Sequence, residues 1–167
     1  MTFRHLLSLV AAAATVLPAV LAAETPAKAG DPALVRVFTG WRDAASFKRI
    51  SEYFDGRENT GGATVLRTHP AQRTGFYFQL RVANPGAPRP VRFQLQLVEQ
   101  GVPAPRTIVL PAELTSGSGL YQLGLTGPEW QDAKSQPIAW QLQVLAAEDG
   151  RVLAAEKSYL WEKPAAN

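Results

Sequence analysis

Few side chains in this sequence could act as nucleophiles, bases or metal ligands. The 167 residues include no cysteine and only two histidines. The missing cysteines exclude disulfides, iron–sulfur clusters, Cys-ligated zinc and a thiol nucleophile. His5 lies in an apolar N-terminal segment, so a serine triad would need His69, and no G-x-S-x-G motif is present. His69 directly precedes Pro70, and we expect it to be a strand-end histidine and not a base.

Carboxylates offer two further possibilities. Glu52 and Asp55 are three residues apart, and a glycosidase needs only two acids. They fall at the exposed end of a predicted helix, where ordinary solvation explains them better. In the loop 55–59, Arg57 occupies a position where a calcium site requires an acid. We therefore expect no enzyme, no metal and no cofactor, and a hydrolase using carboxylates alone is the least favoured alternative.

Residues 1–23 have the pattern of a secretory signal peptide. A short basic start at Arg4 is followed by an Ala/Leu/Val run that ends in small residues, and cleavage after Ala22 or Ala23 fits. We expect a periplasmic or secreted bacterial protein without a membrane span after cleavage. Because residues 6–23 are just long enough to cross a bilayer, an uncleaved anchor is the alternative.

The charge is small and unevenly distributed. The formal charge of +3 falls by one when Arg4 leaves with the signal, which is too little for a nucleic-acid-binding protein. Basic residues outnumber acidic ones between residues 24 and 100, and most are arginines, which can bind carboxylate or phosphate. Most surface arginines are only solvated, but loops added to a common scaffold often carry the residues that contact a partner. The preferred site hypothesis comprises Arg42, Arg49, Arg57, Arg67 and Arg73.

A five-residue pattern of aromatic, Gln, Leu, any residue and aliphatic occurs four times. The copies are at residues 78–82, 93–97, 121–125 and 140–144. Period-two alternation places the apolar residues on one face and the glutamine on the other, so each copy predicts a half-buried strand. If the second and fourth copies share a sheet, their outward glutamines form one neutral patch that either binds a ligand or is merely solvated. This patch would contain Gln94, Gln96, Gln141 and Gln143.

The remaining elements complete a mainly β chain. Further strands are predicted at residues 34–38, 63–68, 106–110 and 152–161, separated by Pro/Gly turns. Asp43 is expected to cap a helix at about 44–54, with Phe47, Ile50 and Phe54 on one face. We predict an antiparallel β-sandwich of about 7–8 strands with one N-terminal helix. The expected layout is a disordered linker at 24–33, one domain at 34–163 and a disordered tail at 164–167.

The strand pattern between residues 74 and 161 resembles that of immunoglobulin-like or fibronectin type III-like β-sandwiches. The likeness lies in short alternating strands and Pro/Gly turns, without the Cys…Trp…Cys signature. It implies a fold but no particular activity, because many functions use this architecture.

The last hairpin has two possible registers. A two-residue turn at 149–150 pairs Trp140 with Tyr159, so that both face the core. A bulge near Glu156 would instead turn Tyr159 and Trp161 outward, beside the glutamines. We favour the regular register because Asp-Gly is a strong turn signal.

These observations predict a protein that acts by binding. The expected partner is another envelope or secreted protein. The alternative is a small carbohydrate-binding module, which the bulged register would favour because exposed aromatic rings stack on sugars.

Overall fold

The computed structural model describes residues 28, 30–102, 104–130, 132 and 136–161. The expected signal peptide at 1–23 and tail at 164–167 lie outside these ranges, as does half of the linker expected at 24–33. In the part of the chain that the structure describes, no helix is long and apolar enough to cross a membrane.

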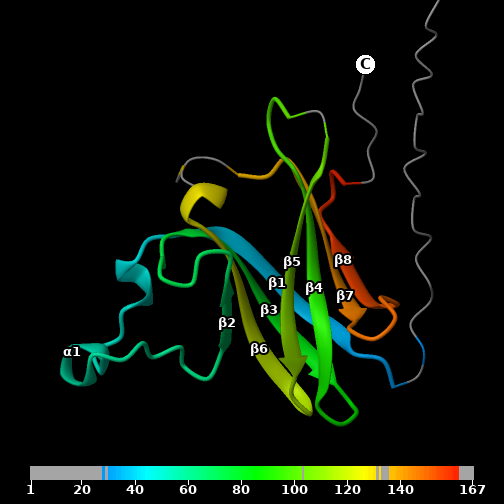
Figure 1. Cartoon of the computed structure of the whole chain (residues 1–167), viewed down its shortest axis with the longest axis horizontal. Helices are drawn as coiled ribbons and strands as arrows, with labels where there is room; N and C mark the ends of the chain where they lie inside the picture. Colours follow the sequence, from blue (N-terminus) through cyan, green and yellow to red (C-terminus); the bar gives the residue numbers. More distant parts are fainter. Residues whose placement is uncertain (1–27, 29, 103, 131, 133–135, 162–167) are drawn as a thin grey trace, which may run out of the picture.

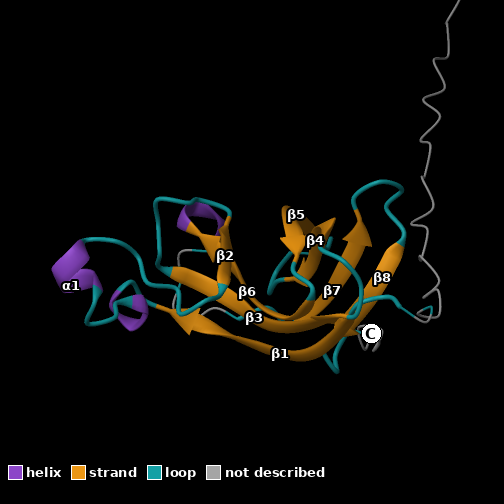
Figure 2. Cartoon of the chain, turned by 90° about the horizontal axis from the view of Figure 1, so that it is seen from below, coloured by secondary structure: helices purple, strands orange, loops and turns teal. Residues whose placement is uncertain are grey.

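Eight strands form two four-stranded sheets that pack against each other (Figures 1 and 2). Sheet A has the order β1-β3-β6-β2, and sheet B has the order β5-β4-β7-β8. The strands are β1 (Ala33–Arg42), β2 (Thr64–Arg67), β3 (Gly75–Asn84), β4 (Arg89–Val98), β5 (Arg106–Leu114), β6 (Gly117–Thr126), β7 (Ala139–Ala146) and β8 (Val152–Lys157). The mainly β, two-sheet architecture is confirmed. One pair departs from the antiparallel expectation, because β2 runs parallel to β6.

The four copies of the sequence pattern are the four central strands of the molecule. Two of them, β3 and β6, pair at the centre of sheet A, while β4 and β7 pair at the centre of sheet B. Their inward side chains form the core, in which Phe93, Leu95 and Leu97 of β4 are fully buried. The pattern predicted these strands because central strands must present an apolar residue at every second position to the facing sheet.

Strand β5 is longer than the strand predicted at 106–110 and continues through Pro111 to Leu114. It lies at the edge of sheet B, with β4 on one side only. An edge strand tolerates proline because one of its sides has no neighbouring strand. Proline, which lacks an N–H, can occupy a position on that side where no hydrogen bond to another strand is needed.

The predicted helix at 44–54 is wrong. Asp43 does cap a first turn by accepting a 2.7 Å hydrogen bond from the N–H of Ser46, but this turn is a short 3₁₀ helix, η1 (Ala45–Phe47). Lys48 has an extended backbone (φ −71°, ψ 124°), which ends the helix. A single α-helical turn follows, α1 (Glu52–Asp55), and Gly56 terminates it with φ 67°. A second short 3₁₀ helix, η2 (Gly127–Glu129), follows β6.

The regular register of the last hairpin is also wrong. The turn has four residues, 147–150, and is closed by a 2.9 Å bond from the N–H of Ala146 to the carbonyl of Arg151. One extra residue, Leu153, bulges from β8, so that Leu142 pairs with Glu156. The bulge therefore exists but lies earlier than the alternative placed it.

Asp31 is held two residues before β1. It accepts hydrogen bonds of 2.9 and 3.2 Å from the guanidinium of Arg151, beside the β7–β8 turn. Arg151 lowers the pKa of this carboxyl, with help from the backbone N–H of Lys28. The described end of the expected linker is thus bound to sheet B.

Candidate functional site

Residues 43–63, here called the β1–β2 segment, leave the sandwich and return to it. The segment lies over one end of the outer face of sheet A, and α1 projects beyond the strands (Figures 1 and 2). Three aspects of it bear on function: how it is anchored, what it displays and what it encloses.

Tyr77 of β3 is the anchor point. Its position in the strand alternation directs it to the outer face of sheet A, yet it is 0% exposed. Gly40 and Gly124 are its neighbours on β1 and β6, and a Cβ at Gly124 would lie 2.5 Å from the Tyr77 ring. The ring of Phe47 covers it at a centroid distance of 4.7 Å. Burial raises the pKa of Tyr77, so its hydroxyl stays neutral and can donate a hydrogen bond.

Two ion pairs tie the segment to this tyrosine. Arg67 forms a two-pronged pair with Glu58, with one contact at 3.0 Å, and Arg73 contacts Glu52 at 2.7 Å. Each arginine lowers the pKa of its carboxyl partner through the side-chain hydrogen bond. Arg67 and Arg73 were predicted to contact a partner protein, but here their charges are engaged within the chain.

The other three arginines of the predicted set remain available. Arg42, Arg49 and Arg57 form no ion pair with any acidic side chain that the structure describes. Arg57 is exposed on the segment. Arg42 and Arg49 line a recess of about 200 Å³ together with Gln79 and Gln122. We call this the arginine recess.

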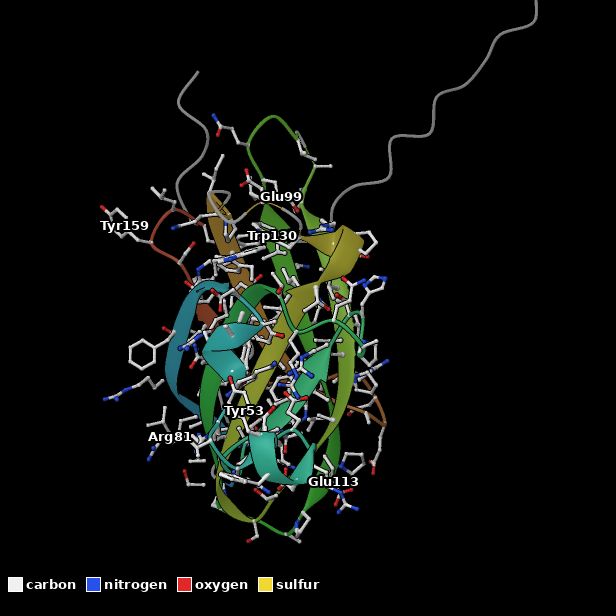
Figure 3. All side chains as sticks on the ribbon, turned by 90° about the vertical axis from the view of Figure 1, so that its left-hand side faces the viewer. Tyr53, Arg81, Glu99, Glu113, Trp130 and Tyr159 are labelled. Carbon is white, nitrogen blue, oxygen red and sulfur yellow. The ribbon has the colours of Figure 1, made fainter. Side chains whose placement is uncertain are left out.

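The segment displays a cluster that sequence reasoning missed. Ile50, Tyr53 and Phe54 are 78%, 73% and 86% exposed, and we call them the apolar tip. Figure 3 looks towards this end of the molecule, with Tyr53 labelled. Ile50 and Phe54 were predicted to share one helix face with Phe47, but only Phe47 packs on the sandwich. The apolar spacing was visible in the sequence, whereas the break at Lys48 that turns the tip outward was not.

The glutamine patch is assembled as predicted but is less open. Gln94 pairs with Gln143 and Gln96 with Gln141 across β4 and β7. The amide of Gln94 donates a 3.3 Å hydrogen bond to the side-chain oxygen of Gln143, which is only 6% exposed. The other three are half-buried, so little of this surface is free to receive a ligand.

His69 and the acidic pair have structural surroundings. The Nδ1 of His69 lies 2.9 Å from the carbonyl of Thr126, so this nitrogen carries the proton and donates it. Glu52 is held by Arg73, and a carboxyl with a lowered pKa is a poor general acid at neutral pH. Within the described ranges, no three His, Cys, Asp or Glu side chains are grouped to hold a metal ion.

The geometry therefore describes a mainly β protein of two packed sheets, with an anchored segment that carries both an apolar tip and a polar recess. Comparisons with family models, curated proteins and solved structures found no match to this chain.

Proposed function

We propose that this chain is an exported, non-enzymatic binding domain that docks on another envelope or secreted protein through its apolar tip. The observation that carries the proposal is the exposure of Ile50, Tyr53 and Phe54 on a segment whose base packs on the buried Tyr77. Exposed apolar clusters on folded proteins mark interaction sites, and aromatic side chains contribute strongly to interfaces.

The base of the segment favours binding because it limits the entropy lost on association. Glu58 and Glu52 are fixed by ion pairs to Arg67 and Arg73, and Asn59 is held through its N–H, which donates a 3.1 Å bond to Glu52. A binding element already held in place loses less conformational freedom when it docks.

The charges beside the tip indicate the chemistry of the partner. Lys48, Arg49 and Arg57 are exposed on the same segment as the tip. Glu58 is already paired with Arg67, which leaves Asp43 and Asp55 as the exposed carboxylates of the segment that form no ion pair within the described residues. The ammonium of Lys48 lies 5.6 Å from the ring centre of Tyr53. An apolar cavity with an acidic rim would complement this surface in shape and charge.

Export, cleavage of residues 1–23 and a periplasmic or secreted location belong to the same proposal, and the signal-like sequence of that region supports them. The immunoglobulin-like or fibronectin type III-like character of the fold is also part of this proposal, and the two packed sheets support it. Sandwiches of this kind commonly carry binding sites on their loops.

The carbohydrate-binding alternative keeps one observation in its favour. Tyr159 is 80% exposed, as the bulged register required, and it stands beyond the end of β8 (Figure 3). An array of neutral and acidic glycans, probed with the wild type and Tyr159→Ala, tests this alternative. Glycan binding that is lost in the variant would support it.

The test of the main proposal uses the mature chain as bait in extracts of its native envelope. The double variant Tyr53→Ser/Phe54→Ser removes the tip, and Val109→Ser removes a similarly apolar, exposed residue of β5 as the matched control. We expect a protein that the wild type and the control retain and the double variant loses. A photo-crosslinker at position 54 then identifies the direct contact. Equal retention by all three baits, or no crosslink from position 54, would contradict the proposal.

A further inference from the structure

The arginine recess lies between the β1–β2 segment and the outer face of sheet A, and no residue of the apolar tip lines it. Gln79 and Gln122 form its floor, because they are direct cross-strand neighbours on β3 and β6. Arg42 at the end of β1 and Arg49 of the segment form its walls. A wider, shallower hollow of about 640 Å³ shares Arg42 and Gln79 with the recess and extends it over β1.

From this arrangement we infer that the recess and the adjoining hollow bind an acidic sugar, with the uronic acid carboxylate between Arg42 and Arg49. This site goes beyond the docking function proposed above and shares only Arg49 with it. Three features of the recess specify the ligand.

The first feature is a pair of guanidinium groups that no carboxylate pairs with. Glu58 also lines the recess, but it is already held by Arg67 and Arg73. The neighbouring Arg67 and Arg73 are neutralised by Glu58 and Glu52, whereas Arg42 and Arg49 have no acidic partner among the described residues. Guanidinium groups recognise a carboxylate through parallel N–H donors. A neutral sugar would leave both charges unmatched.

The second feature is an acceptor without a donor. The side-chain oxygen Oε1 of Gln122 is buried and accepts no hydrogen bond within the described part of the chain. A buried acceptor without a partner costs free energy, and a rotation of the Gln122 amide that turns Oε1 towards the recess would let a ligand donor recover it. Inorganic phosphate and simple carboxylates are mainly acceptors, whereas a uronic acid carries hydroxyl donors on the ring next to its carboxylate.

The third feature is apolar surface beside the polar groups. Phe38 of β1 lines the wider hollow and is exposed, and it pairs across the sheet with Gln79. Phe47 and Val65 add apolar walls to the recess itself. Aromatic rings beside amide groups suit the C–H faces and hydroxyls of a pyranose ring.

The experiment measures binding of oligogalacturonate to the mature protein by calorimetry, with neutral galactose oligomers of the same length as the comparison. We expect oligogalacturonate to bind at least ten times more tightly than the neutral oligomer. Arg42→Gln should weaken this binding at least tenfold. Arg57→Gln should leave it unchanged, because it removes the same charge from the adjoining β1–β2 segment without touching the recess.

Gln122→Leu separates binding from folding. Because the acceptor that it removes has no donor in the protein, urea unfolding should show that the variant is as stable as the wild type. Its affinity for oligogalacturonate should nevertheless fall at least tenfold. The tip variant Tyr53→Ser/Phe54→Ser should bind oligogalacturonate normally, so failure of the docking proposal and failure of this one are distinguishable.

Several results would overturn the inference. These are equal affinity for the acidic and neutral oligomers, equal losses in the Arg42 and Arg57 variants, or unchanged affinity in Gln122→Leu. Competition by acetate, by acetylated peptides or by inorganic phosphate at concentrations equal to that of the uronate would assign the recess to another anion and would also overturn it.

Discussion

The Nε–H of Arg67 donates a 2.9 Å hydrogen bond to the hydroxyl of Tyr77, and this hydroxyl donates a 2.7 Å bond to the carbonyl of Arg73. One buried phenol thereby joins β2 to the loop before β3, and both arginines continue to the carboxylates of the β1–β2 segment. The projecting segment is therefore supported by the outer face of sheet A.

Tyr77→Phe should lower the free energy of unfolding by about 1–3 kcal/mol, because a buried N–H and a carbonyl each lose a partner. Urea denaturation measures this change. Tyr53→Phe is the control, since it also removes a tyrosine hydroxyl but from an exposed residue of the β1–β2 segment. It should change the free energy of unfolding by less than about 0.5 kcal/mol. Equal effects of the two variants would show that the Tyr77 hydroxyl does not support the segment.

The two glycines beside Tyr77 should differ in their tolerance of a methyl group. Gly124→Ala places a Cβ against the Tyr77 ring and should cost about 1–3 kcal/mol in the free energy of unfolding. Gly40→Ala, on the other side of the same tyrosine, has nothing within 4 Å of its new Cβ and should be neutral or slightly stabilising. Thermal and urea unfolding check the pair. A Gly40 variant as damaging as the Gly124 variant would contradict this packing.

Stability should fall in acid because three carboxyls have a lowered pKa in the folded protein. Arg151 lowers the pKa of Asp31, Arg73 that of Glu52 and Arg67 that of Glu58. Depressed folded-state pKa values stabilise the protein above the unfolded-state values, near pH 4, and this contribution is lost as the pH falls through the folded-state values.

Glu58→Gln should therefore be less stable than the wild type at pH 7 and approach it as the pH falls below the lowered folded-state pKa of Glu58, where this carboxyl is protonated in both states. Urea unfolding across this pH range tests the prediction. Gln96→Leu is the control. It removes no titrating group, so its free energy of unfolding should change with pH as that of the wild type does. A Glu58 variant with the same pH dependence as the wild type would exclude this ion pair as a source of acid sensitivity.

Removing the apolar tip should leave the fold intact. Phe54→Ser should change the free energy of unfolding by less than about 0.5 kcal/mol, because the side chain is 86% exposed. Phe47→Ser should cost about 2 kcal/mol or more, because its ring packs on Tyr77. Thermal unfolding compares the two. Similar losses in both would mean that Phe54 packs on the protein.

Sequence reasoning reached the sheets more readily than the site. The glutamines of β4 and β7 were predicted to be neighbours because central strands repeat the same burial pattern, and the structure pairs them in register. The register of the last hairpin was not predictable, because a four-residue turn and a bulged Leu153 replaced the expected tight turn. Loop length and bulges depend on how the strand ends meet, which local residue preferences specify only weakly.

The arginines show the same division. The sequence indicated that basic residues gather around the β1–β2 segment, and charge alone could not separate those that fix the segment from those that stay available. Only the folded chain brings Glu58 to Arg67 and Glu52 to Arg73 while leaving Arg42 and Arg49 over the glutamines of sheet A. Alternation of apolar and polar residues along a strand is a local property that adjacent residues determine. The selection of ion-pair partners depends on distances between segments far apart in the chain, and the tertiary structure alone sets them.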